Sequence, residues 1–419
     1  MKRVLLSLLF ALLLQTVGTG PVWAGASGEE ITLDDLDDKS LTLNHVNPLR
    51  LPGRTYDDKA HQTLITGYAV ASYRFNDNGV AHGHGTELHF GQDAANTTRF
   101  GFDLISVGFT KRFSDYAWVA AAFEIGLHDN ASATNTELDV GEIHLVAPVG
   151  NGIDFNIGKF NSPVSFEQED APLLLQASHS LTYQFGSPAK MSGVLITYPI
   201  QENLEIRGAV YNGWDRNAGD GDNNKVPSFM VQVGYAPTQW ADFRFSFLRG
   251  AEVSNNEDDH RNVWDLVATL TPGRNWIVGI EANYGFDENQ SNQAGGGPAE
   301  WYTGQVTVHR DFTRNFGTTV RYSIFDDRDG HPDIHSRAKR TMNEITIAPV
   351  FHISPEFLGY LGFGVIPRTQ HMLSGIDLRL EYRYDWINEP ENDNRLFSDV
   401  RGGRVNERNM FVAEVVASF

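Results

Sequence analysis

Residues Asp377–Trp386 read DLRLEYRYDW, and this stretch decides the fold. Charged and apolar side chains alternate strictly along it, so five charges share one face and five apolar or aromatic side chains share the other. A period of two residues is the pattern of a β-strand. Five charges on one face need water or close pairing, whereas the opposite face needs apolar surroundings. Two architectures satisfy both demands: a soluble sandwich with its charges outward, or a transmembrane barrel with a wet lumen.

The lengths of the segments and of the turns favour the barrel. From His61 onward, alternating segments of about ten residues follow one another. A membrane-spanning strand takes roughly 9–11 residues, whereas a sandwich strand takes about 5–6. Short connections such as 114–115 alternate with long polar ones such as 214–225. We therefore expect an all-β, transmembrane antiparallel β-barrel with short periplasmic turns and long extracellular loops.

Sixteen segments qualify as strands, an even number that brings both chain ends to the periplasmic side. They are 66–75, 100–113, 116–128, 136–148, 153–160, 190–199, 203–213, 227–237, 240–250, 262–271, 275–286, 301–311, 316–326, 343–353, 376–387 and 409–419. Two further stretches, 86–90 and 357–366, leave eighteen strands as the alternative, and the second of them could instead be a periplasmic insertion. A barrel of this size encloses an aqueous channel rather than a packed core.

The last segment, Met410–Phe419, alternates in the same way and ends on an aromatic residue. This ending resembles that of bacterial outer-membrane proteins generally. The resemblance implies that the barrel assembly machinery reads the terminal residue, here Phe419, as a membrane assembly signal.

Composition excludes several classes of protein. The 419 residues include no Cys and carry a net charge of −20 at pH 7. The absence of thiols rules out disulfide frameworks and Cys-ligated zinc. The negative charge argues against nucleic acid as a partner. Outside the first 24 residues, no apolar run approaches the roughly 20 residues of a membrane-spanning helix.

The N-terminus has the pattern of an export signal. A basic start precedes an apolar run, Val4–Leu14, and small residues end at Ala24. We expect three regions in a protein of the bacterial outer membrane: a cleaved signal peptide at 1–24, an acidic periplasmic extension at 25–60, and the barrel at 61–419.

The motif GKFNSPVSFE at 158–167 ends one predicted strand and opens the longest loop, 161–189. It resembles the G-K-F-x-x-P-x-x-x-E stretch of the OmpL-like β-barrel porin family, and the resemblance covers residues 65–419. The resemblance implies a passive diffusion channel for small hydrophilic solutes or ions, surrounded by outer-membrane lipid and lipopolysaccharide. It fixes no substrate. General porins are usually trimers, so a homotrimer stays open, although the sequence specifies no self-complementary face.

Loop 161–189 resembles the inward-folded loop that narrows general porins, and this likeness implies that it folds inward and narrows the lumen. Glu167, Glu169 and Asp170 would then place negative charge at the constriction, with Lys190 at the far end of the loop. The alternative is an outward, solvated loop. Along the strands, alternation places further charges on the lumen face: Glu124, Glu205, Arg207, Asp242, Arg244, Glu281, Arg321, Asp377, Arg379, Glu381, Arg383 and Asp385.

Rings of charge set which ions pass a channel. Because acids outnumber arginines on the predicted lumen face, we expect weak cation selectivity. The main alternative is a non-conducting scaffold or adhesion barrel. An outer-membrane enzyme is a further alternative, although the sequence contains no G-x-S-x-G and no H-E-x-x-H motif.

No cofactor and no metal site are predicted. Acidic stretches in the long loops, such as 255–259 and 389–393, offer oxygen ligands for Ca²⁺ or Mg²⁺, which would bridge to lipopolysaccharide phosphates. Solvated loops without an ion are the alternative. Two histidine groups could bind a transition metal, although isolated surface histidines are commoner. These groups are His82, His84 and His89, and His331 and His335.

Overall fold

The computed structural model describes residues 63–80, 97–127, 134–214, 222, 224–253, 255–273, 275–291, 297–330, 339–353, 375–388 and 397–418. Sixteen strands among them form one closed antiparallel barrel, in which neighbours in the chain are neighbours in space. Within these residues, no helix has the length and apolar character needed to cross a membrane.

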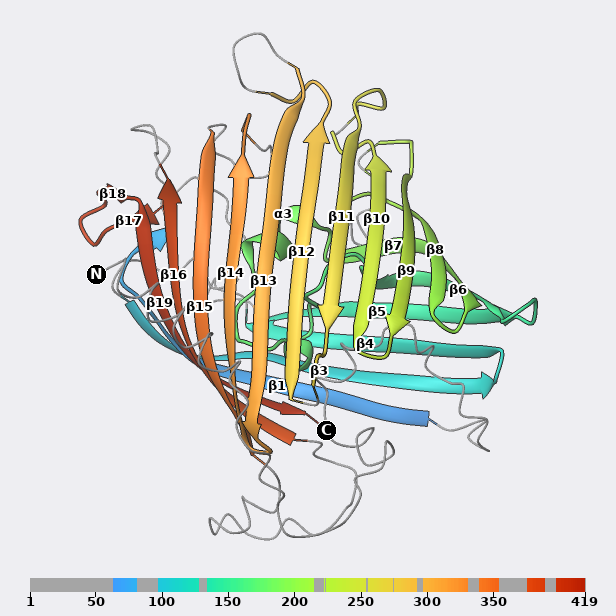
Figure 1. Cartoon of the computed structure of the whole chain (residues 1–419), viewed down its shortest axis with the longest axis horizontal. Coiled ribbons are helices and arrows are strands. Elements are labelled where there is room, and N and C mark those ends of the chain that lie inside the picture. The colour runs from blue at the N-terminus through green and yellow to red at the C-terminus, as the bar shows by residue number, and fades with distance from the viewer. Residues whose placement is uncertain are drawn as a thin grey trace. The chain divides into compact units, whose positions relative to one another are not determined.

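The barrel closes where the first strand pairs with the last one. Its strands are β1 (Thr63–Asn76), β3 (Thr97–Ser114), β4 (Ala117–Leu127), β5 (Thr134–Ala147), β6 (Ile153–Asn161), β7 (Lys190–Gln201), β8 (Leu204–Tyr211), β9 (Ser228–Thr238), β10 (Ala241–Gly250), β11 (Arg261–Leu270), β12 (Trp276–Asp287), β13 (Ala299–Thr313), β14 (Phe316–Asp327), β15 (Arg340–Ile353), β16 (Gly375–Asn388) and β19 (Glu407–Ser418). In Figure 1, β3 to β5 run across the direction of β12 to β16, because the strands of a barrel tilt against its axis.

The sixteen strands predicted from the sequence are all present, and the prediction of sixteen is confirmed. The alternative of eighteen strands is wrong, because β1 pairs directly with β3 and β15 pairs directly with β16. No place is left in the ring for an extra strand on either side. The two doubtful stretches, 86–90 and 357–366, lie outside the described residues.

Alternation along each strand divides the barrel wall into two faces, as β9 illustrates. Its even-numbered residues from Ser228 to Gly234 are buried, whereas the odd-numbered ones are exposed on the outside. The outward residues are Phe229, Val231, Val233 and Tyr235. A soluble barrel would hold such side chains in water at a cost of roughly 25 cal/mol per Å² of apolar surface. A band of this kind instead meets lipid in outer-membrane barrels.

The two ends of the barrel differ in the length of their connections. At one end, β3 and β4 are joined by residues 115–116, and β13 and β14 by residues 314–315. At the other end, residues 251–260 join β10 to β11. Short turns face the periplasm in outer-membrane barrels. We refer to the two ends as the periplasmic and extracellular ends on this basis.

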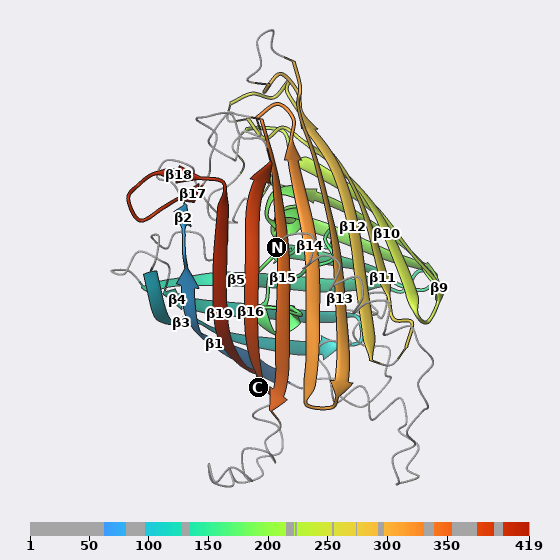
Figure 2. The ribbon, with the colours of Figure 1, turned by 60° about the vertical axis from the view of Figure 1, so that its left-hand side comes forward.

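A small sheet lies beyond the barrel rim, away from the sixteen strands (Figure 2). It joins β2 (Gly79–Val80), which follows β1, to β17 (Phe397–Ser398), and β17 pairs in turn with β18 (Arg404–Val405), which precedes β19. Side chains beside it make the same connection: Asp77 accepts hydrogen bonds from the backbone N–H of Asn409 at 2.7 Å and from its side-chain amide. The first and last extracellular loops therefore meet over the seam between β1 and β19.

Candidate functional site: a loop folded along the inner wall

The connection between β6 and β7, residues 162–189, lies against the inner wall of the barrel and does not extend into solvent. It contains a short 3₁₀ turn, η2 (Ala171–Leu173), and one helix, α3 (Leu181–Gly186). Ser180 begins this helix, because its side chain accepts a hydrogen bond from the backbone N–H of Tyr183 at 3.0 Å. In Figure 1, α3 lies inside the barrel, where it packs against β12 to β15.

Glu167 fastens the loop to the wall and does not present its charge to the lumen. Its Oε1 lies 2.8 Å from Nη1 of Arg321, whose Nε donates to Glu344 at 3.1 Å. Glu167 also accepts from the side chain of Gln176 at 2.7 Å and from the backbone N–H of Ser180 at 2.8 Å. The side chain is only 2% exposed, and a carboxylate at such depth must be paired. Glu167 therefore lies buried between the loop and the wall, where Arg321 pairs its charge.

Glu381 forms a second attachment. Its Oε2 accepts the backbone N–H groups of Ala177 at 2.8 Å and Ser178 at 3.0 Å. On the same strand, Arg383 donates to the carbonyl of His179 at 2.6 Å, and Arg379 donates to the carbonyl of Ala171 at 2.8 Å. A buried irregular backbone needs partners for its N–H and C=O groups. The wall supplies them here from ionised side chains.

Glu281 and an aromatic ring form the third attachment. Glu281 accepts from the backbone N–H of Phe166 and from the hydroxyl of Ser165, both at 3.1 Å. The ring of Phe166 lies directly over Gly279, where an added Cβ would come within 2.2 Å of the ring. Phe166 packs there with the apolar side chains of Leu175, Val267 and Ile277.

The predicted lumen-lining charges all lie on the inner face of the wall, but the wall pairs most of them. Glu205 pairs with Arg207 and Asp242 with Arg244, each along its own strand. Two more acids of β16 are paired with residues of neighbouring strands. Asp385 lies between Arg383 of its own strand and Arg408 of β19, and Asp377 contacts His352 of β15. The loop covers five of them, namely Glu281, Arg321, Arg379, Glu381 and Arg383. These five attach the loop and do not line open water.

The opposite side of the loop faces β1, β4 and β5 and carries an excess of acid. We call Glu124, Asp139, Glu169 and Asp170 the acidic cluster. Lys190 pairs with Asp139 and, at 2.8 Å, with Glu169. The hydroxyl of Tyr68 lies 2.9 Å from Glu124 and 3.1 Å from Asp170. Its one hydrogen is therefore the donor available to both carboxylates. One lysine thus faces four acids, and three of the four predicted constriction residues, Glu169, Asp170 and Lys190, lie together here.

Asp139 is the member of this cluster that the sequence reasoning missed. Strict alternation from the inward-facing Glu142 would turn Asp139 toward lipid. The pairing of β4 with β5 passes from Ala122 opposite Val140 to Phe123 opposite Leu138, so Asp139 is the extra residue of a β-bulge. The bulge leaves Asp139 buried beside Lys190. A carboxylate on the apparent lipid face of a strand was the signal that could have revealed it.

Burial raises the pKa of both loop carboxyls in the acidic cluster. For Glu169, loss of hydration raises the pKa, the Lys190 ammonium opposes the rise, and Asp139 and Asp170 add to it. The pKa of Asp170 is raised for the same reason, with Lys190 again opposing and Asp139 adding. Glu169 nevertheless keeps 30% of its side chain exposed. Both groups therefore hold a proton more firmly than ordinary carboxylates, and Glu169 is also accessible to solvent.

Several predicted residues lie outside the described part of the chain. They are Phe419, the two histidine groups, and the acidic stretch 389–393. Of the stretch 255–259, Asn256 donates to Asp259 at 2.6 Å, and Glu257 lies 3.4 Å from Lys225. Neither contact tests divalent-ion binding by these loops.

Comparisons with known proteins point to one class. A family model described as "Putative beta-barrel porin-2, OmpL-like" matches residues 43–419. No curated protein matches the chain.

Solved structures share the fold at low sequence identity. The outer membrane channel DcaP of Acinetobacter baumannii has a TM-score of 0.57 at 11% identity, over 87% of this chain and 99% of that one. The anion-selective porin from Comamonas acidovorans has a TM-score of 0.55 at 10% identity, over 85% and 99%. OmpT of Vibrio cholerae in its trimer form has a TM-score of 0.52 at 10% identity, over 86% and 100%.

Proposed function

This chain belongs to the OmpL-like β-barrel porin family and is an outer-membrane porin, and from that premise we propose that it is a passive channel for small hydrophilic solutes or ions with a weak preference for cations. The observation that carries the preference is the acidic cluster. Four carboxylates gather around one lysine where the loop meets β1, β4 and β5. Fixed charge beside a pore sets the sign of the ions that pass it.

Pairing on the rest of the wall supports the same conclusion. Glu205 with Arg207, Asp242 with Arg244 and Glu414 with Arg379 each combine opposite charges at close range. Such pairs leave little net field at a distance, because the two charges screen each other. The acidic cluster differs from these pairs, because its carboxylates outnumber its one lysine.

The fold itself does not decide the sign of selectivity. The Comamonas acidovorans porin shares the barrel and is described as anion-selective. Local side chains must therefore set the preference in each porin, and in this chain they are the acids that adjoin Lys190.

The test is the reversal potential in a salt gradient across a planar bilayer. We expect a cation-selective sign for the natural protein, and a shift toward zero or toward anions in the double variant Glu169→Gln/Asp170→Asn. Glu202→Gln changes an exposed acid in the turn between β7 and β8 and should leave the potential unchanged. Clear anion selectivity of the natural protein would overturn the proposal. Silence of correctly folded protein would support the alternative of a non-conducting scaffold or adhesion barrel.

The family and the neighbouring structures are channels, which favours a non-enzymatic role for this chain. A homotrimer remains part of the proposal, and the trimer form of Vibrio cholerae OmpT supports it by analogy of fold. We also keep as proposals the cleavage of residues 1–24, the periplasmic extension at 25–60, recognition of Phe419 by the barrel assembly machinery, and bridging of the acidic loops to lipopolysaccharide by Ca²⁺ or Mg²⁺.

A further inference from the structure

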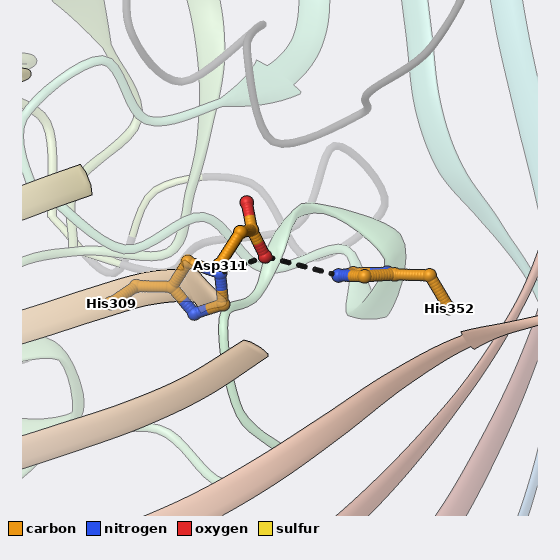
Figure 3. Close-up of side chains that lie close together, drawn as sticks. All are labelled: His309, Asp311 and His352. Carbon is orange, nitrogen blue, oxygen red and sulfur yellow. Dashed lines mark hydrogen bonds and ion pairs between the residues drawn. The ribbon is translucent and has the colours of Figure 1, made fainter. Parts of the chain in front are cut away.

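Two histidines and an aspartate meet at the periplasmic end of the inner wall (Figure 3). His309 and Asp311 lie on β13, and His352 lies on β15. Oδ1 of Asp311 is 3.1 Å from Nε2 of His309 and 3.5 Å from Nε2 of His352. The three candidate ligand atoms all lie within 4.8 Å of one another. We call these three residues the mouth cluster.

The other nitrogen of each imidazole is held by an acceptor. Nδ1 of His309 lies 2.9 Å from the hydroxyl oxygen of Thr319, which donates its own hydrogen to the carbonyl of Leu175 at 2.5 Å. Nδ1 of His352 lies 2.8 Å from Oδ1 of Asp377. Each ring therefore donates from Nδ1, and its neutral form carries the lone pair on Nε2. This arrangement, with the ligating nitrogen inward and the other nitrogen fixed by an outer acceptor, is the one that metal-binding histidines adopt.

The strand between the two histidine-bearing strands leaves room for the cluster. Gly317 of β14 stands opposite Asp311 on one side and Val350 on the other. A Cβ at Gly317 would lie 2.6 Å from Oδ1 of Asp311 and 2.9 Å from Cε1 of His309. Gly317 does not have the positive φ that would itself require glycine. The missing side chain therefore provides space beside Asp311 and His309.

The spacing fits a small metal ion. A tetrahedral ion with bonds of about 2.0–2.1 Å separates its ligand atoms by about 3.3–3.4 Å. The two separations from Asp311, 3.1 and 3.5 Å, lie on either side of this value. Two imidazoles and one carboxylate suit divalent transition metals such as Zn²⁺, Ni²⁺ and Cu²⁺, whereas Ca²⁺ and Mg²⁺ prefer oxygen ligands alone. His352 is 29% exposed and Asp311 is 35% exposed, so an ion could enter and keep water at its open positions.

We propose that His309, Asp311 and His352 form a binding site for one divalent transition-metal ion at the periplasmic mouth of the lumen. Asp377 and Thr319 orient the two imidazoles from behind. Arg379, whose Nη2 is 3.7 Å from Asp377, is the nearest cation in these contacts. Through Thr319 and Leu175 the site also contacts the inner loop, so bound metal and loop share one hydrogen-bonded chain.

The test is Zn²⁺ titration by calorimetry of the full chain in detergent, expressed without a histidine tag and stripped with a chelator. We expect one Zn²⁺ per chain for the natural protein. His352→Ala and Asp311→Asn each remove a ligand and should weaken binding at least about 100-fold, since loss of an outer partner alone costs about 10–100-fold. Asp377→Asn should show that smaller loss. Gly317→Ala should also weaken binding while every ligand is retained.

A matched control distinguishes this site from other histidines. His260 lies in the loop between β10 and β11, where its Nδ1 contacts the carbonyl of Asp258 at 3.0 Å. His260→Ala should bind Zn²⁺ like the natural protein. Cu²⁺ bound to the natural protein should show two nitrogen couplings in electron paramagnetic resonance, and one in His352→Ala. No Zn²⁺ binding by the natural protein, or unchanged affinity in folded His352→Ala and Asp311→Asn, would overturn the proposal.

Discussion

Glu167 and Glu169 lie two residues apart on the same loop and have opposite surroundings. Glu167 points to the wall and is neutralised by Arg321. Glu169 points to the acidic cluster, where Lys190 is shared with Asp139. The sequence presents the two acids as equivalents, whereas the structure assigns one to attachment and the other to the field beside the pore.

At this scale, the raised pKa values of Glu169 and Asp170 predict a pH dependence of selectivity. A raised pKa means that these carboxyls take up protons at a higher pH than an ordinary carboxylate, whose pKa is about 4. Cation preference should therefore decline as the pH falls, and the decline should begin at a higher pH than an ordinary carboxylate would give. Reversal potentials measured in steps from pH 8 to pH 4 would follow the decline.

The control for this pH series is the double variant Glu169→Gln/Asp170→Asn, which has no charge to lose at these positions. Its reversal potential should stay flatter over the same range. If the natural protein and the double variant gave parallel curves, the titrating groups would have to lie elsewhere on the wall.

At the scale of elements, the inner loop is held by complementary shapes as well as by charge. The ring of Phe166 fills the space that Gly279 leaves on β12. A methyl group on that glycine would overlap the ring, and overpacking of this kind costs about 1–3 kcal/mol. We therefore expect Gly279→Ala to lower the thermal stability of the barrel and to make the single-channel current noisier, because the loop segment around Phe166 must shift.

Two further variants separate this effect from a general glycine effect. Phe166→Ala combined with Gly279→Ala should be less destabilised than the sum of the two single changes, because the overlap is gone. Gly304→Ala places the same methyl where the nearest atom is 3.5 Å away, and it should behave like the natural protein. Strict additivity of the first pair would contradict the proposed contact.

At the scale of the whole molecule, the outward face of the barrel is apolar around its circumference. Phe102 on β3, Phe245 on β10 and Val415 on β19 are examples of large side chains that remain exposed. An exposed apolar surface of this extent promotes association in water. We expect the mature chain to be monodisperse in detergent and to aggregate when detergent is removed, as measured by size-exclusion chromatography with light scattering. A folded, soluble monomer without detergent would contradict the membrane assignment.

The strands and their inward faces could be predicted from the sequence because period-two alternation is a local property. The alternation of adjacent residues is enough to predict that Arg383 faces inward and Tyr382 faces outward. The partners of the inner loop could not be predicted, because Arg321 and Glu167 are 154 residues apart and meet only after the barrel closes. The mouth cluster depends on register in the same way, since His309 and His352 are brought together across an intervening strand.

The small sheet of β2, β17 and β18 has a consequence for the stability of the seam between β1 and β19. Its members come from the two loops that adjoin the first and last strands of the barrel. Pairs such as Val80 with Phe397 therefore link the loop that follows the first strand to the loop that precedes the last one. Separation of β1 from β19 at the extracellular end therefore requires these additional backbone pairs to break as well.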